Sequence, residues 1–146
     1  MTGECLICAK HRGEGPLVGH RVWADEHVIV SHRPVGNDGT TVLGYLFVES
    51  RRHAPSLDAL TEVEAVAIAR AAWRAARGLR AELGPEFVFS AIVGRSVAHF
   101  HQHLFARYQN TPEQCSWMDS AAWPGSKRGG LDEVADLSAR LALHLG

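Results

Sequence analysis

Three histidines alternate with other residues in the run His99-Phe100-His101-Gln102-His103. Period-two alternation is typical of a β-strand, in which every second side chain points to the same face. On such a strand the three imidazoles would lie roughly 6.6 Å apart from neighbour to neighbour. Each buried ring needs hydrogen-bond partners, so three together are hard to explain as ordinary core residues. The pattern therefore predicts a strand with one chemically active face.

Two kinds of site use histidines in this arrangement, a metal centre and a centre for phosphoryl chemistry. Zinc sites use pairs of histidines at alternate positions of a strand. The upstream segment Gly94-Arg95-Ser96 favours phosphate, because a tight turn can aim backbone N–H groups and the Ser96 hydroxyl at phosphate oxygens. Imidazole is a competent nucleophile near neutral pH, and a second histidine can protonate a leaving group. Phosphate chemistry is our interpretation, and a metalloenzyme that uses the three histidines as ligands is the alternative.

The rest of the sequence predicts an α+β fold. Thr61 and Glu64 form a capping box, so a long helix is expected from here to about Leu83, where Gly84-Pro85 stops it. The order of elements predicts an antiparallel meander sheet with one long helix and a C-terminal helix. Apolar runs and turn signals predict strands over 21–32 (two strands), 43–49, 87–92 and 98–108. The closing helix is expected over 132–145.

The composition is that of one compact domain. The chain has 146 residues, of which 46% are hydrophobic and 21% are charged, so it can bury a substantial core. Its formal net charge of −1 does not favour nucleic acid or a membrane as a partner. The first residues lack the apolar core of a signal peptide, which predicts a cytoplasmic protein.

Three cysteines are an odd number for a disulfide framework. Cys5 and Cys8 form a C-x-x-C pair, and Cys115 stands alone in a turn-rich tail. In a reducing compartment such a pair indicates a metal site, a redox site or plain packing. The pair opens the chain, in a stretch of 20 residues predicted to be a loop, whereas a redox motif is expected at the start of a helix that follows a strand.

The region around the three histidines resembles the histidine-triad (HIT) family of nucleotide hydrolases and transferases, and in particular its bacterial zinc-containing members. The run 99–105 matches the family signature of three histidines separated by apolar residues, except that Gln102 is polar and will need a hydrogen-bond partner. The match extends to Gly94-x-Ser96-Val97, to the central strand at 44–48 and to His53.

The resemblance covers most of residues 5–107 and implies one HIT domain over 1–146, with a C-terminal tail and helix at 108–146. It implies an α+β antiparallel meander that dimerises into a continuous sheet. An alanine-rich helix that carries Trp73 also suits a homodimer, although alanines are simply good helix formers as well.

The same resemblance implies a nucleotide-type small-molecule substrate, namely a phosphoanhydride, a phosphoramidate or another nucleotidyl conjugate, and a covalent mechanism. His101 would attack the α-phosphate of a nucleotide conjugate, and water would cleave the resulting nucleotidyl-histidine, with no catalytic cofactor. Ser96 and His103 would contact the phosphate and the leaving group. A nucleotidyltransferase or phosphorylase with the same intermediate, or a nucleotide-binding protein with little turnover, are the alternatives.

Bacterial HIT proteins of this kind often bind structural zinc through two cysteines and two histidines. Carried onto this sequence, the resemblance assigns Cys5, Cys8, His53 and His99 as ligands. Four such ligands close a tetrahedral shell and leave no position open for water. The alternative is that the cysteines are unmetallated thiols and that His53 is a solvated loop residue.

The chain departs from the family pattern at several positions. Tyr45 stands where the family often has a histidine. Arg33 lies near the position of an aspartate that binds ribose, and Arg95 follows Gly94 where glutamine is common. Both arginines suit an anionic substrate, although exposed arginines are more often solvated surface. The remaining histidines are expected at the surface or in local hydrogen bonds: His11, His20, His27, His32 and His144.

The tail contains two tryptophans in a turn-rich context. Trp117 and Trp123 are expected to anchor the tail on the body of the protein. The alternative is that one of them forms a wall for a base or a leaving group, with Lys127 and Arg128 facing phosphates.

Overall fold

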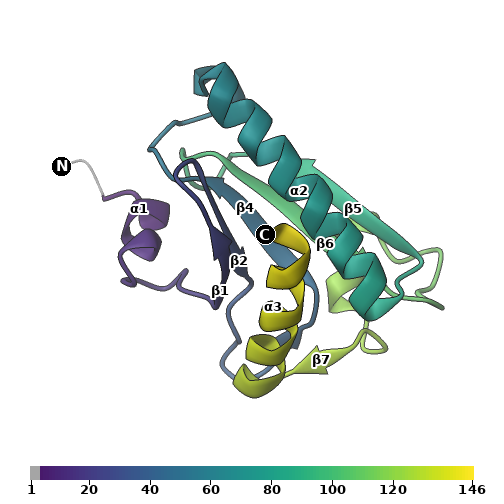
Figure 1. Ribbon diagram of the computed structural model, residues 1–146. Helices are drawn as coiled ribbons and strands as arrows, with labels where there is room; N and C mark the ends of the chain where they lie inside the picture. Colours follow the sequence, from purple (N-terminus) through teal and green to yellow (C-terminus); the bar gives the residue numbers. More distant parts are fainter. Residues whose placement is uncertain (1–3) are drawn as a thin grey trace.

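The computed structural model describes residues 4–146, which form a five-stranded antiparallel sheet with α2 and α3 lying across one face (Figure 1). This confirms the predicted α+β class. The elements in chain order are α1 (Leu6–His11), β1 (Arg21–Ala24), β2 (Val28–His32), β3 (Thr41–Val42), β4 (Tyr45–Ser50), the 3-10 helix η1 (Leu57–Ala59), α2 (Glu62–Leu83), β5 (Phe87–Ile92), β6 (His101–Arg107), the 3-10 helix η2 (Trp117–Ala122), β7 (Arg128–Gly129) and α3 (Leu131–Leu145).

The strand order in the large sheet is β1-β2-β4-β6-β5, which differs from a simple meander at one place. The chain leaves β4, passes through α2 to the edge of the sheet, and returns as β6 between β4 and β5. This order places β6 directly beside β4, where Glu49 pairs with His101 and Phe47 pairs with His103. A second, two-stranded sheet joins β3 to β7.

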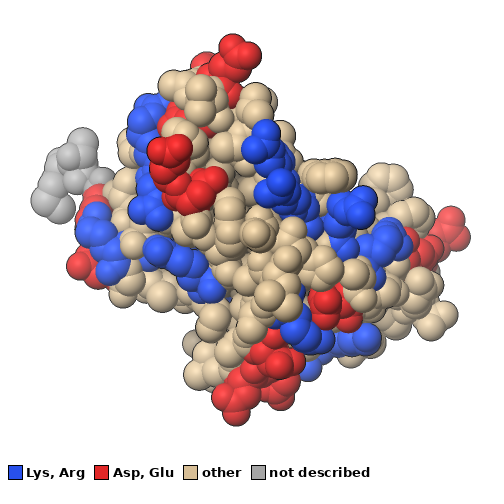
Figure 2. Space-filling model, in the orientation of Figure 1, with Lys and Arg blue, Asp and Glu red and all other residues tan. Residues whose placement is uncertain are grey.

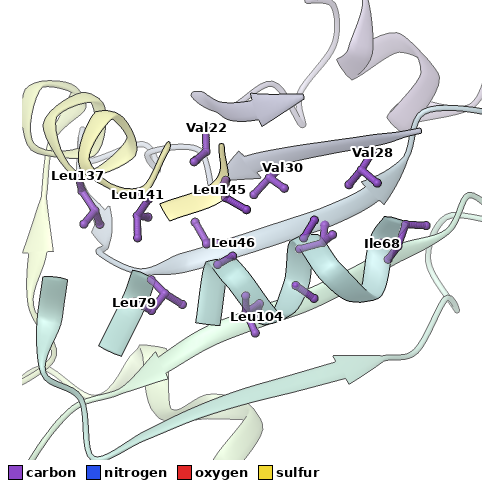
Figure 3. Packing of buried hydrophobic residues seen from close by; sticks show 14 of the residues in the cluster. Val22, Val28, Val30, Leu46, Ile68, Leu79, Leu104, Leu137, Leu141 and Leu145 are labelled. Atoms are coloured by element: carbon purple, nitrogen blue, oxygen red, sulfur yellow. The ribbon is translucent and has the colours of Figure 1, made fainter. Parts of the chain in front are cut away.

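The core lies between the sheet and the two long helices. Figure 3 shows side chains of α2 and α3 directed toward the sheet, and these residues are almost completely buried. Alternation along the strands sends Leu46 and Leu104 into this core and their neighbours to the opposite face. The labelled core residues are Val22, Val28, Val30, Leu46, Ile68, Leu79, Leu104, Leu137, Leu141 and Leu145.

Helix α2 begins and ends where the sequence predicts. The Thr61 hydroxyl accepts from the Glu64 backbone N–H at 3.1 Å, and the Glu64 carboxylate accepts from the Thr61 N–H at 2.8 Å. The helix ends at Gly84, whose φ of 56° lies in the left-handed region that glycine adopts at little cost. Trp73 lies on the outward side of this helix and is 60% exposed.

Two sequence predictions of local structure were wrong. The first 20 residues were expected to form a loop, but they contain α1, for which the Cys5 sulfur accepts the N-terminal hydrogen bond from the Cys8 N–H. The strand expected over 98–108 begins only at His101, so His99 lies in the bend before it. The expected partner of Gln102 is present, because its amide donates to the Ser90 hydroxyl at 2.8 Å.

Charged side chains of both signs are interspersed over the face of the molecule drawn in Figure 2. Within residues 4–146, no helix has the length and apolar character needed to cross a bilayer.

His32 was expected at the surface or in local hydrogen bonds, and it makes a local hydrogen bond from a position in the core. Its ring is completely buried, its Nδ1–H donates to the Arg33 carbonyl at 2.8 Å, and its Nε2 accepts from the Gly44 N–H at 3.0 Å. Burial lowers the pKa of His32, and the charge of Arg33 acts in the same direction. The neutral ring therefore joins the end of β2 to the turn before β4.

We expect His32 to make the folded state sensitive to acid. Its contribution to the free energy of unfolding is fully present above the unfolded-state pKa of roughly 6.5 and is lost as the pH falls toward the lower folded-state pKa. His32→Phe should cost about 1–3 kcal/mol at pH 8, because the Gly44 N–H loses its acceptor. Between pH 8 and 5.5 its melting temperature, followed by circular dichroism, should fall less steeply than that of the wild type.

The control is His27→Phe, because His27 is not among the groups that shift the pKa of His32, and this variant should keep the wild-type pH slope. Equal slopes for His32→Phe and the wild type would contradict the prediction.

Candidate functional site

A cavity of about 370 Å³ opens on the sheet face opposite α2 and α3. Its floor comes from residues that alternate with the core residues on β4 and β6. The cavity brings together all the residues predicted to bind or attack the substrate. Its lining includes Arg33, Arg95, Ser96, His101 and His103.

His101 stands at the start of β6 with one ring nitrogen engaged. Its Nδ1–H donates to the backbone carbonyl of His99 at 2.7 Å. A carbonyl can only accept, so the proton is on Nδ1 and the lone pair is on Nε2. Among residues 4–146, Nε2 has no hydrogen-bond partner, and the ring borders the cavity. This is the protonation state that nucleophilic attack by Nε2 requires.

His103 lies beside His101 on the same face, with 5.4 Å between the ring centroids. Its Nδ1 is 2.8 Å from the Tyr45 hydroxyl, and Phe47 packs against its ring. Burial lowers the pKa of His103, and nearby His101 and Arg33 lower it further, whereas Glu49 acts in the opposite direction. The ring is therefore held neutral near pH 7.

The loop between β5 and β6 also lines the cavity. Gly94 has a φ of 73°, in the left-handed region that side chains disfavour, and it turns the chain away from the edge strand β5. Arg95 and Ser96 follow it at exposed positions that border the cavity. Both side chains are thus free to contact a ligand in front of His101.

The four residues predicted to bind metal form a second cluster next to this cavity. Their ligand atoms all lie within 4.8 Å of one another. The Nδ1 atoms of His53 and His99 are 3.3 Å apart, and the Cys8 sulfur is 3.4 Å from each of them. The Cys5 sulfur is also 3.4 Å from His99 Nδ1. Ligands on a tetrahedral zinc ion are separated by roughly 3.3–3.8 Å, so the spacing and the donor set both fit zinc.

His99 is oriented for this cluster by its other nitrogen. The ring is completely buried, and its Nε2–H donates to the Ser50 carbonyl at 2.7 Å, which leaves the lone pair of Nδ1 for a metal. His99 faces the cysteines because it precedes β6 and does not share the strand alternation of His101 and His103. Among the described residues, the cluster with metal-ligand spacing contains His99 but neither His101 nor His103. The alternative of a metalloenzyme that uses all three histidines as ligands would require the three together.

Sequence reasoning missed a group of three polar residues, Glu49, Lys10 and His11, between the cluster and the cavity. Glu49 on β4 is almost completely buried, and its carboxylate accepts from Lys10 at 2.9 Å and from His11 at 3.0 Å. Burial alone would raise the pKa of Glu49, but the His11 hydrogen bond and the Lys10 charge outweigh it and lower the pKa. The sequence did contain one signal for this group, because Glu49 is a carboxylate in a mostly apolar strand.

His11 was expected at the surface or in local hydrogen bonds, and its ring instead bonds to Glu49, which is 38 residues away in sequence. The centroid of its ring lies 5.3 Å from that of His99, with the two rings perpendicular. Helix α1 turns His11 and Lys10 toward the sheet, which a loop in the same place would not do. Lys10 also lies over the Phe47 ring, at 4.7 Å from its centroid. Lys10 and Glu49 therefore form one end of the cavity.

The tryptophans of the tail lie outside the cavity lining. Trp123 packs against the cluster that contains Tyr45 and Phe105, as expected of an anchor. Trp117 is 67% exposed and stacks on Phe89 with 5.3 Å between the ring centroids. The tail thus covers the sheet beside the cavity.

Comparisons with known proteins identify the fold. No protein-family profile and no curated protein sequence matches the chain. Among solved structures, a zinc-bound histidine triad family protein from Mycobacterium smegmatis matches with a TM-score of 0.70 and 20% identity, over 97% of this chain and 94% of that one. A HIT family protein from Bacillus anthracis matches with a TM-score of 0.62 and 24% identity, over 82% and 79% of the two chains.

A histidine triad nucleotide-binding protein from Sulfolobus tokodaii also matches, with a TM-score of 0.69 and 16% identity, over 97% of this chain and 91% of that one. At these identities the likeness establishes the fold. The chain has the histidine-triad fold over nearly its whole length.

We expect the cluster to bind about one equivalent of zinc per chain, measurable by elemental analysis of purified protein. Cys5→Ser combined with Cys8→Ser should abolish binding and clearly lower the melting temperature, because the metal would pin α1 to the bend before β6.

Cys115→Ser is the matched control, since Cys115 lies outside the cluster, and it should retain both metal and stability. Wild-type protein that takes up no zinc on reconstitution would contradict the assignment.

Proposed function

We propose that this chain is a member of the HIT family and hydrolyses nucleotide phosphoanhydrides, phosphoramidates or other nucleotidyl conjugates through a covalent intermediate on His101. The observation that carries the proposal is the hydrogen bond from His101 Nδ1–H to the His99 carbonyl, at 2.7 Å. It directs Nε2 of His101 toward the cavity, next to His103, whose pKa is lowered by burial.

The proposed reaction has two steps. In the first, His101 Nε2 forms a bond to the α-phosphorus, the bond from phosphorus to the leaving group breaks, and its electron pair departs with that group. In the second, the oxygen of a water molecule bonds to phosphorus and one proton of that water passes to solvent, while the P–N bond breaks and its electron pair returns to His101 Nε2. The nucleoside monophosphate leaves as the product.

Charge and hydrogen-bond donors around the cavity support a phosphate ligand. Arg33 and Arg95 border the cavity from two different loops, and Ser96 adds a hydroxyl. Donors that are already placed around a phosphoryl group stabilise the negative charge of the transition state. We assign these three residues and His103 to binding of the phosphoryl group.

Zinc at the neighbouring cluster would serve this site structurally. Cys5, Cys8, His53 and His99 would hold it, and the ion would fix the His99 ring in place. The backbone of His99 is also what orients the nucleophile. The metal ligands would thus stabilise the position of the carbonyl on which the protonation state of His101 depends.

His101→Asn should reduce kcat by at least about 1000-fold on a nucleotide substrate such as a dinucleoside polyphosphate. The variant should remain folded and retain substrate binding, because the other residues of the cavity are unchanged. Mass spectrometry of wild-type enzyme quenched during turnover should place a nucleotidyl adduct on His101.

The control is His27→Asn, a histidine outside the cavity that should retain full activity. An adduct on His103, or near wild-type turnover by His101→Asn, would remove His101 as the nucleophile.

We also propose that the protein is a homodimer. β5 is an edge strand with exposed Phe87 and Ile92, and open sheet edges are hazards that proteins usually cover. Trp73 lies exposed on α2, the helix that leads to this strand. A second copy that packs on both features would bury them together.

Light scattering at micromolar concentration should therefore give a mass near twice the 15.9 kDa of one chain. Trp73→Glu should shift the distribution toward monomer by placing a charge in the contact, whereas Leu143→Glu, at an exposed position of α3, should leave the mass unchanged. A wild-type mass near 15.9 kDa would refute the dimer.

A further inference from the structure

Tyr45 contacts the second histidine of the cavity and has no role in the reaction as described so far. Its ring is buried on β4, stacked on Phe105, and its hydroxyl is 2.8 Å from His103 Nδ1. Within residues 4–146 this is the one hydrogen bond of that hydroxyl. If Nδ1–H donated to it, the phenol proton would be left without an acceptor in a buried place, which is costly. The hydroxyl therefore donates and His103 Nδ1 accepts.

The hydrogen bonds of the two neighbouring histidines thus favour opposite tautomers. His101 donates from Nδ1 to a carbonyl, so its Nε2 carries a lone pair. His103 accepts at Nδ1 from Tyr45, so the proton of its neutral ring is on Nε2. Two identical side chains, 5.4 Å apart, become a nucleophile and a hydrogen-bond donor.

The charges around His103 favour its neutral form. Arg33 lies over the Tyr45 ring, at 5.1 Å from its centroid, and the His101 ring lies 5.4 Å from the His103 ring. From β4, Glu49 opposes them, but its carboxylate is already paired with Lys10 and His11 from α1. The result is a lowered pKa of His103, caused first by burial and then by His101 and Arg33. Protonation of His103 would also place a proton on its Nδ1, where it would face the hydroxyl proton of Tyr45.

We propose, on the basis of the proposed function, that Tyr45 is a positioning residue that holds His103 as a neutral Nε2–H donor. The cavity thereby selects substrates whose leaving group departs as an oxygen anion. Phosphoanhydrides are then the preferred substrate class, and phosphoramidates are poor substrates.

The chemistry of the two leaving groups explains this selection. In a phosphoanhydride the P–O bond breaks as His101 Nε2 bonds to phosphorus, and the electron pair stays on a phosphate oxygen that needs no proton. The Nε2–H of His103 stabilises that oxygen by a hydrogen bond. In a phosphoramidate the leaving nitrogen must gain a proton as the P–N bond breaks. A protonated His103 could supply one, but Tyr45 keeps His103 neutral.

The test compares wild type with Tyr45→Phe on two substrates, diadenosine tetraphosphate and an adenosine 5′-phosphoramidate of an aliphatic amine. The wild type should prefer the anhydride. In Tyr45→Phe, His103 Nδ1 is free to take a proton, so at pH 6 the ratio of kcat/KM for phosphoramidate over anhydride should rise at least about 10-fold, through kcat. Tyr108→Phe is the matched control. Tyr108 is the second of the two tyrosines in the sequence, it is also buried, and its hydroxyl donates to the Leu43 carbonyl outside the cavity, so the ratio should stay at the wild-type value.

Nitrogen-15 NMR of the imidazoles gives a readout that does not depend on turnover, with His103 assigned from a His103→Gln variant. The wild type should show a protonated Nε2 and an unprotonated Nδ1, and Tyr45→Phe should shift this balance. A wild-type His103 protonated on Nδ1, or an unchanged substrate ratio in Tyr45→Phe, would overturn the inference. If no variant turned over either substrate, the proposed function and the substrate preference would both fail, whereas the NMR result would still decide the role of Tyr45 toward His103.

Discussion

The position of His99 is the constraint on which the rest of the site depends. Its ring nitrogens join the Cys5–Cys8 pair to the Ser50 carbonyl, and its own carbonyl accepts from His101. One residue thus connects the N-terminal helix, the end of β4 and the start of β6. Because the ring is completely buried, a change at any of these contacts would move the carbonyl that sets the protonation state of His101.

The strand β4 organises the opposite wall of the cavity. Its alternation sends Leu46 and Val48 into the core, while Tyr45, Phe47 and Glu49 face the cavity side. Each of these three has a different function in the architecture. Tyr45 engages His103, Phe47 packs against both His103 and Lys10, and Glu49 ties down α1. The cavity therefore depends on α1, a helix of six residues that would be unstable alone.

The two tautomers illustrate how chemistry is set by surroundings and not by residue type. The His99 carbonyl beside Nδ1 of His101 leaves Nε2 of that ring as the acceptor. The Tyr45 hydroxyl beside Nδ1 of His103 makes Nε2 of the neighbouring ring a donor. Both partners belong to the folded state, since the carbonyl is fixed by a bend before β6 and the phenol by a strand 58 residues away in sequence. The same pair of histidines in an unfolded chain would have no such difference.

The sequence by itself determined the elements that local rules govern. The capping box placed α2, the apolar run at 87–92 coincides with β5, and the alternation of His101 and His103 correctly predicted a shared face. Resemblance to a known family supplied the four residues whose ligand atoms the structure brings within 4.8 Å of one another: Cys5, Cys8, His53 and His99. Tertiary structure alone decided the surroundings of His11, His32, Lys10 and Glu49, because burial depends on segments distant in sequence. It also decided that His99 leaves the strand, because a ring that faces Cys5 and Cys8 at the start of α1 cannot at the same time face the cavity with its neighbours.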